Sequence, residues 1–319
     1  MRPVALIALA ICTPACTAGK TVTLGSVFPV PYHFDTPVLV AELASPSRTD
    51  NPTLTGDLLE IYFTTDRVSG NGDVWFATRA TATAPFGTPA PVTAVNGDSF
   101  ETSSAISTDG LTLWFGSDRA GGVGANDIWV SQRATRASAW SPPVDVVALN
   151  SPADDIPRPP GQHALVMPMA STKGTAINPA SGGNYQTYLA TRANPGAPFG
   201  APVAIPELAY ADHSTVDGFL TDDGLTMFFS SAPLAEPADA AVSAADGGRS
   251  GDGGVANSDL FVAWRRSTSE LFSAPQALVD LNTPADERDP WLTPDGTTLY
   301  FTSTRGGALN IYTAAVRPR

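Results

Sequence analysis

Short runs of alternating hydrophobic and polar residues, separated by glycine- and proline-rich turns, dominate the chain. The clearest examples lie at 106–115 and 292–301, where two such runs flank an Asp-Gly pair. Alternation with a period of two is typical of β-strands, and Asp-Gly between two runs predicts a type I′ hairpin turn, whose central residues need positive φ. A third run follows each pair, at 127–130 and 310–313. This recurring order of runs and turns predicts an array of repeated β units.

Aligning the units on the hydrophobic pair of the second strand gives five copies. The pairs are Tyr62-Phe63, Trp114-Phe115, Val166-Met167, Phe228-Phe229 and Tyr300-Phe301. The first three pairs lie 52 residues apart, whereas the last two spacings are longer. The final expansion is explained by an insert at 235–257, which is rich in Ala, Gly, Asp and Ser and has no apolar periodicity. We expect this insert to form a loop.

The two ends of the array complement each other. The first four units each end in a segment that combines an aromatic residue with proline, such as 86–92 and 272–275, but the fifth unit reaches Arg319 without one. The same pattern stands near the N-terminus, at 34–40. The sequence therefore predicts an all-β fold: a five-bladed β-propeller of four-stranded blades, closed by an N-terminal strand that completes the last blade. We expect residues 21–319 to form this single domain and to be monomeric.

Composition and charge narrow the class of partner. The 319 residues carry a formal net charge of −13, and their 18 Lys and Arg form no cluster. This distribution argues against nucleic acid as a partner. No apolar stretch approaches the roughly 20 residues that a spanning helix needs, so we expect membrane contact only through a lipid anchor.

Residues 1–20 resemble a secretion signal. Arg2 precedes a short apolar run at 4–12, and Ala15-Cys16 resembles the cleavage site of bacterial lipoproteins, in which the cysteine becomes lipidated. We therefore predict an exported protein, periplasmic or anchored in the outer membrane through Cys16. An ordinary signal peptide cut nearby, or an uncut anchor, is the alternative. Cys12 and Cys16 are the only cysteines, so no disulfide is expected in the domain.

Two segments, 117–130 and 293–303, resemble the WD40-like β-propeller repeat of bacterial envelope proteins. Related propellers include that of the periplasmic Tol-system protein, and the resemblance covers residues 28–319. It implies an envelope-associated module that binds an envelope protein or a cell-wall or surface glycan. The family carries no shared catalytic residues. The Asp-box of sialidases is rejected, because Gly110 follows Asp109 directly whereas that box places one residue between them.

The alignment also places five polar residues at one equivalent position, just before the first strand of each unit. Because innermost strands line the channel of a propeller, we expect these residues to ring one mouth of a central funnel. They are Asn51, Ser103, Asp155, Asp217 and Asp289. Converging carboxylates repel one another unless a cation, a water network or a neighbouring Arg balances them. Ca²⁺ held by the three aspartates is one prediction, and no other cofactor is expected; turn capping by each side chain is the alternative.

Glu101 and Glu287 lie two positions earlier in their units and are expected near the same mouth. Together with the aspartates they raise the alternative of a glycoside hydrolase or lyase, which needs two carboxyl groups with separated pKa values. These carboxylates recur in repeat register, as structural residues do, so we assign no catalytic residue and favour binding over catalysis.

One tryptophan and a recurring Asp-Arg pair carry two further predictions. Trp291 is predicted to face the funnel, where a sugar or peptide would stack on it. The Asp-Arg pairs 66–67 and 118–119, with Arg305 in unit five, are predicted to form salt bridges or turn locks within their blades.

Overall fold

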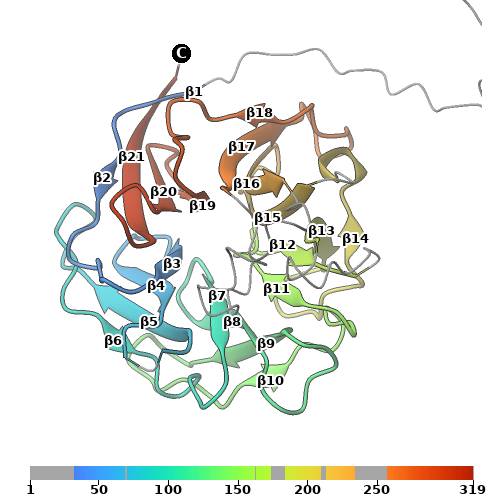
Figure 1. Cartoon of the computed structure of the whole chain (residues 1–319). Coiled ribbons are helices and arrows are strands. Elements are labelled where there is room, and N and C mark those ends of the chain that lie inside the picture. Colours follow the sequence, from blue (N-terminus) through green and yellow to red (C-terminus); the bar gives the residue numbers. More distant parts are fainter. Residues whose placement is uncertain are drawn as a thin grey trace, which may run out of the picture.

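The computed structural model describes residues 32–68, 70–161, 163–173, 184–209, 213–233 and 257–318, and shows five antiparallel sheets arranged around a central axis (Figure 1). Each sheet is one blade. Blade one contains β3 (Thr49–Leu54), β4 (Glu60–Thr65), β5 (Asp73–Thr78) and β6 (Ala90–Pro91). Blade two contains β7 (Glu101–Ile106), β8 (Thr112–Ser117), β9 (Asp127–Gln132) and β10 (Val144–Asp145). Blade three contains β11 (Asp155–Pro157), β12 (Val166–Ser171), β13 (Gln186–Thr191) and β14 (Val203–Ala204). The five-bladed propeller predicted from the sequence is confirmed.

The two remaining blades follow the same plan, with a short 3-10 helix, η1 (Pro206–Leu208), before blade four. Blade four contains β15 (His213–Leu220), β16 (Thr226–Pro233), β17 (Asp259–Trp264) and β18 (Gln276–Ala277); blade five contains β19 (Glu287–Leu292), β20 (Thr298–Ser303), β21 (Asn310–Pro318), β2 (Val38–Leu39) and β1 (Tyr32–Phe34). The first strand of each blade, namely β3, β7, β11, β15 or β19, lies nearest the axis (Figure 1).

Blade five is completed by the N-terminal part of the chain. Val38 pairs with Thr313, and Phe34 pairs with Val316, so both β1 and β2 lie on β21. The Val40 amide also donates to the Ile311 carbonyl at 2.9 Å. The predicted closure is therefore confirmed, and it covers the edge that β21 would otherwise leave unpaired.

The core lies between neighbouring blades. Phe63, Phe115, Phe229 and Phe301, on the second strands of four blades, are fully buried. Burying one such ring contributes about 1.5–3 kcal/mol. The hydrophobic half of the repeat pattern thus defines the faces that pack against each other, and the ring of blades is held by this packing.

The fourth strand of each blade is only two residues long, and in three blades an asparagine replaces the next pair of ladder bonds. Asn96 accepts from the Val74 amide at 2.9 Å and donates to the Val74 carbonyl at 3.0 Å. Asn150 and Asn282 bind β9 and β17 in the same way. The outer edge therefore ends in side-chain bonds rather than in a long exposed strand, which limits edge-to-edge association.

The Asp-Gly hairpin turns differ from the predicted type I′. Gly110 has a φ of +75°, but Asp109 keeps a negative φ, and the Gly110 amide donates to the Ser107 carbonyl at 2.8 Å. This is a type I turn followed by one left-handed residue. Asp109 Oδ1 accepts from the Leu111 amide at 2.9 Å and from Ser107 Oγ at 2.6 Å, which fixes the turn without positive φ at the aspartate. In blade one Leu58, with a φ of 63°, takes the left-handed position.

Three expectations fall outside the described residues: the signal segment 1–20, lipidation at Cys16, and nearly all of the insert 235–257. Within the part of the chain that the structure describes, no helix is long and apolar enough to cross a membrane.

Candidate functional site

A β-bulge marks the inner strand of four blades at the position that the sequence singled out. Strand register shifts between Asp50 and Thr53 in β3, and the same shift recurs in β7, β15 and β19. The bulged residues are Asn51, Ser103, Asp217 and Asp289, with φ of 55°, 51°, 63° and 57°. Asn and Asp tolerate left-handed backbone better than most residues, and bulges re-aim side chains. The repeat thus places four polar residues around the axis.

The two aspartates of this set converge on one arginine. Arg158 Nη2 lies 2.6 Å from Asp289 Oδ1 and forms a second, close ion pair with Asp217 Oδ1. All three residues are buried, with exposed fractions of 4%, 3% and 2% for Arg158, Asp289 and Asp217. We call these three residues the axis network. Opposite charge at this distance offsets the repulsion between the aspartates and part of the cost of burying them.

Blade three supplies Arg158 because its inner strand lacks the bulge. Ile156 pairs with Ala170 and Pro157 with Met169 without a shift, and the Arg158 amide then donates to the Pro168 carbonyl at 3.0 Å. Sequence reasoning did not identify Arg158 as a site residue. The available signal was a basic residue directly after the first strand of the one unit whose pattern departs from the others.

Hydroxyl groups extend the axis network between blades. Asp289 Oδ2 accepts from Thr302 Oγ1 at 2.7 Å and from the Asn51 amide at 3.2 Å. Ser230 Oγ donates to Asp217 Oδ2 at 2.8 Å and accepts from the Asp289 amide at 3.2 Å. The network therefore joins blades one, three, four and five at the axis, and its acceptors are largely satisfied from within the protein.

Glu101 and Glu287 are also used internally. Glu101 Oε1 accepts from Arg119 at 2.9 Å, and its other oxygen accepts from the Gly97 amide at 3.1 Å. Glu287 Oε1 accepts from Arg305 at 3.0 Å. Burial raises the pKa of Glu101, although its hydrogen bonds and Arg119 oppose that shift. Arg119 and Arg305 form salt bridges within their blades as predicted, with these glutamates as partners, whereas Arg67 donates to the Leu43 carbonyl and to Thr49 Oγ1.

The predicted position of Asp155 in the ring is wrong. Asp155 pairs with Ser171 as Glu101 pairs with Ser117, so it belongs to the glutamate position, two residues before the ring. Its Oδ2 accepts from the amide and the hydroxyl of Ser151 at 2.6 and 2.7 Å. Equal spacing of the first units misplaced it, because unit three has no aromatic pair to fix the register. Capping of the preceding turn, the alternative weighed for it, is what Asp155 does.

Trp291 does not face the funnel. Only 5% of it is exposed, and it packs in the core between blades five and one, with its ring 5.9 Å from Tyr300 and 6.0 Å from Phe219. The bulge at Asp289 is the physical reason. An inserted residue shifts the alternation of the strand, so side chains two positions apart no longer share a face.

The described residues contain no group of three or more His, Cys, Asp or Glu side chains placed to hold a metal ion. Asp217 and Asp289 instead share the guanidinium of Arg158, while Asp155 binds Ser151. The three aspartates proposed as Ca²⁺ ligands are thus not gathered into one site.

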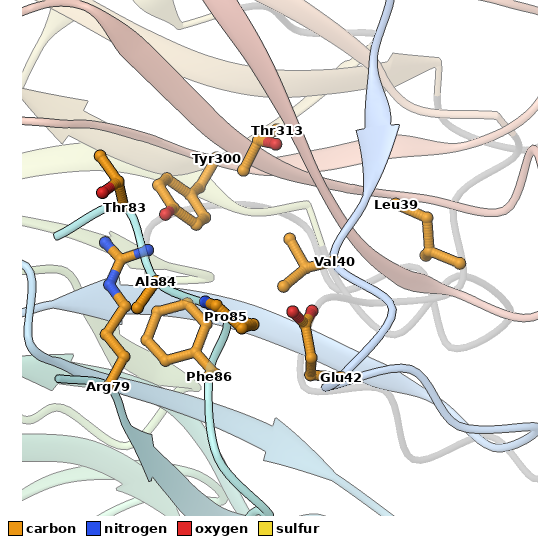
Figure 2. Close-up of a pocket in the computed structure, with 10 residues that line it drawn as sticks. All are labelled: Leu39, Val40, Glu42, Arg79, Thr83, Ala84, Pro85, Phe86, Tyr300 and Thr313. Carbon is orange, nitrogen blue, oxygen red and sulfur yellow. The ribbon is translucent and has the colours of Figure 1, made fainter. Parts of the chain in front are cut away.

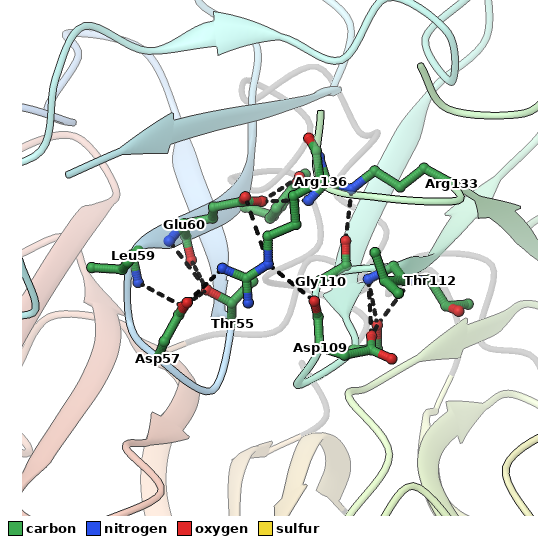
Figure 3. A network of polar contacts seen from close by, with 12 residues as sticks. Thr55, Asp57, Leu59, Glu60, Asp109, Gly110, Thr112, Arg133 and Arg136 are labelled. Atoms are coloured by element: carbon green, nitrogen blue, oxygen red, sulfur yellow. Dashed lines mark hydrogen bonds and ion pairs between the residues drawn. The ribbon is translucent and has the colours of Figure 1, made fainter. Parts of the chain in front are cut away.

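A second polar cluster lies between blades one and two (Figure 3). Arg133 Nη2 lies 2.6 Å from Glu60 Oε2, and Arg136 Nη1 lies 2.6 Å from Asp57 Oδ2. Tyr62 donates to Glu60 Oε2 at 3.0 Å. Both arginines follow β9 and reach across to blade one. This cluster shows how an inter-blade interface of this protein accommodates a carboxylate.

These features define a closed five-bladed β-propeller with a buried arginine–aspartate network at its axis. The sequence matches no protein-family model and no curated protein sequence. Among solved structures, the chain is similar to the endo-arabinase of Bacteroides thetaiotaomicron VPI-5482, with a TM-score of 0.53 and 12% identity over 88% of this chain and 97% of that one. The chain is also similar to the catalytic domain of the Coprinopsis cinerea GH62 α-L-arabinofuranosidase, with a TM-score of 0.51 and 8% identity over 90% of this chain and 96% of that one.

TolB from Acinetobacter baumannii is also similar, with a TM-score of 0.49 and 15% identity over 86% of this chain. The alignment covers 56% of TolB, so the chain spans little more than half its length. At these identities the likenesses show the propeller fold alone.

Proposed function

We propose that this protein is an exported, envelope-associated binding module that docks a protein or a glycan, tethered by a lipid on Cys16. The observation that carries the proposal is the internal pairing of the axis carboxylates. Asp217 and Asp289 are held by Arg158, and Glu101 and Glu287 by Arg119 and Arg305. These groups support a rigid scaffold, which is what a docking surface requires.

The same pairing weighs against the alternative of a glycoside hydrolase or lyase. Such an enzyme needs two carboxyl groups that face the substrate, one of them with a raised pKa. Asp217 and Asp289 are 2% and 3% exposed, and their oxygens accept from protein donors. Substrate would have to displace Arg158 to reach them. The similarity in fold to the endo-arabinase therefore gives no reason to prefer a glycan over a protein as the partner.

The loops at one rim of the ring offer the docking surface. The loops from β4 to β5, β10 to β11 and β18 to β19 all lie on the rim where the inner strands begin. They expose Val68, Val147 and Val279, with exposed fractions of 76%, 66% and 72%. We call this the loop rim. Exposed apolar side chains on a strongly acidic protein favour a partner with apolar and basic groups.

Binding and hydrolysis assays test this proposal together. The chain would be assayed by biolayer interferometry against purified envelope proteins and a panel of cell-wall and surface glycans. Val147→Asp with Val279→Asp should weaken binding at least tenfold. Val144→Asp with Val203→Asp is the matched control, because those valines are as exposed but lie on the outer strands β10 and β14. Hydrolysis of arabinan or aryl glycosides that disappears in Asp289→Asn would overturn the proposal in favour of the enzyme.

A further inference from the structure

The interface between blades one and two provides a template for carboxylate binding inside this protein. There the Glu60 carboxylate accepts from the Tyr62 hydroxyl at 3.0 Å and from Arg133 at 2.6 Å. The rings of Phe76 and Trp140 lie against Tyr62, with centroid distances of 5.8 and 6.1 Å. Burial and the charge of Glu60 raise the pKa of Tyr62, so its hydroxyl remains protonated and donates.

The interface between blades five and one repeats the two donors. Tyr300 pairs with Thr313 of β21 as Tyr62 pairs with Phe76 of β5, so the two tyrosines are equivalent. Arg79 directly follows β5, as Arg133 directly follows β9. The donor pair of the first interface therefore recurs at the seam where the ring closes.

The carboxylate and one ring of the template do not recur. Thr298 stands at the register position of Glu60, and its side chain brings no carboxylate. Thr313 stands at the position of Phe76 and is much smaller. Two larger side chains of the first interface are thus replaced by threonine at the second, which leaves space beside the donors.

A cavity of about 330 Å³ that is widely open to solvent lies at this seam, and Figure 2 shows the side chains around it. Arg79, Phe86, Tyr300 and Thr313 line it, and Glu42 stands on its far side. The volume suits a small organic molecule. We call it the seam cavity.

Arg79 has charge available for a ligand. Its Nε donates to the Leu58 carbonyl at 2.6 Å, and its guanidinium stacks on Phe86 at 4.4 Å from the ring centroid. Among the described residues it forms no ion pair, unlike Arg133 with Glu60. Burial raises the pKa of Tyr300 and the charge of Glu42 adds to the shift, while the charge of Arg79 and a side-chain hydrogen bond from Arg79 oppose it, so the phenol keeps its proton as a donor.

We propose that the seam cavity binds a small monocarboxylate with an apolar body. The carboxylate displaces the contact between Arg79 and the Tyr300 hydroxyl and accepts from both, as the Glu60 carboxylate accepts from Arg133 and Tyr62. The apolar body lies against Thr313 and Phe86, in the part of the interface that Phe76 fills in blade one. Glu42 disfavours a second negative charge on the ligand. This site is separate from the loop rim and does not depend on the function proposed for it.

Titration calorimetry with 3-phenylpropionate tests the site, and 3-phenylpropanol serves as the uncharged molecule of matched shape. We expect 3-phenylpropionate to bind and to raise the melting temperature, and the alcohol to bind at least tenfold more weakly. Tyr300→Phe should weaken binding of the carboxylate by roughly 10- to 100-fold, because a hydrogen bond to a charged group is lost.

Thr298→Glu gives an independent test. It supplies the internal carboxylate of the template, so we expect it to abolish binding of 3-phenylpropionate while the melting temperature is kept or raised. Thr226→Glu makes the same change at the equivalent position of blade four and should leave binding intact. The proposal is overturned if 3-phenylpropionate fails to bind at millimolar concentration, or if it binds equally well to Tyr300→Phe and Thr298→Glu.

Discussion

Arg158 of blade three donates to Asp289 of blade five at 2.6 Å, although blade four lies between them. The same guanidinium also pairs with Asp217 of blade four. One cation thereby serves two bulged aspartates from different blades. This contact replaces the cation that two converging carboxylates would otherwise need.

Removing Arg158 should destabilise the protein strongly. Arg158→Met leaves two buried carboxylates without a counter-charge, and breaking a buried pair in this way costs about 3–5 kcal/mol. Urea unfolding would measure the loss. Arg317→Gln is the control, because that residue is exposed and its pair with Asp35 contributes at most about 1 kcal/mol. Adding Asp217→Asn and Asp289→Asn to Arg158→Met should restore part of the stability; equal losses for Arg158→Met and Arg317→Gln would contradict the role of the axis network.

Asp155 should make stability depend on pH. Burial raises its pKa above the ordinary value of 3.8, and hydrogen bonds from Ser151 and Ser171 only partly oppose this. The folded state then holds the proton more tightly than the unfolded chain does. The stabilisation that this proton contributes is complete below the pKa of Asp155 in the unfolded chain, and it is lost as pH rises through the pKa of Asp155 in the folded state. Compared with Asp155→Asn, the wild type should therefore gain stability on acidification from pH 7 towards pH 3.5, as measured by denaturant midpoints. A constant difference across that range would exclude the effect.

The left-handed glycines of the hairpin turns should differ in their tolerance of alanine. Gly110 and Gly296 have φ of +75° and +70°, so alanine is strained by about 1 kcal/mol or more at either position. A Cβ at Gly110 would also lie 2.8 Å from Arg136 and 3.0 Å from Thr55, whereas nothing lies within 4 Å at Gly296. Gly110→Ala should lower the melting temperature more than Gly296→Ala. Similar shifts would mean that only backbone conformation matters there.

The closing strand should matter more than an ordinary outer strand. Val40→Pro removes the amide that binds Ile311, and Val92→Pro removes the equivalent bond to Val74 in blade one. Val92 lies in a blade whose strands are continuous in sequence, whereas Val40 lies where the N-terminal segment pairs with the C-terminal strand β21 to close the ring. Val40→Pro should therefore cause the larger fall in melting temperature and visible oligomers in size-exclusion chromatography. Equal behaviour of the two variants would show that closure adds nothing to the local bond.

Added Ca²⁺ or EDTA should leave the melting temperature unchanged within about 1 °C, because Arg158 already balances Asp217 and Asp289. Differential scanning fluorimetry measures this directly. A Ca²⁺ shift that is lost in Asp217→Asn would instead restore the cation predicted from the sequence.

Repeat pattern and turn chemistry were enough to predict the blades and their closure. Both are local signals that recur: the buried aromatic pairs such as Phe115 and Phe301, and the proline segment before β2. The positions of Asn51, Ser103, Asp217 and Asp289 at the axis were predicted for the same reason. The bulge that aims them was not, since one inserted residue leaves no compositional mark beyond a polar residue before Pro52 or Pro290.

The site was less predictable because it depends on how blades differ. Arg158 reaches the axis because β11 lacks the bulge. An alignment of the repeats does not reveal it, because an arginine with this role occurs in one unit only. Trp291 was predicted to face the funnel from its place between Asp289 and the Asp295 turn, and that position alone does not reveal the bulge that turns its side chain into the core. The seam cavity results from two threonines, Thr298 and Thr313. Their effect on the space beside Tyr300 is seen only when the strand registers of blades five and one are compared.

The missing bulge of blade three also constrains the number and order of the blades. In an assembly of identical repeats no blade would differ from another, whereas here Arg158 pairs with Asp217 one blade away and with Asp289 two blades away. A ring with an added, deleted or exchanged blade would leave these three charges mismatched in a buried space. The least regular repeat, blade three, thus disfavours duplication of a blade, because an extra blade would separate these three charges at the axis.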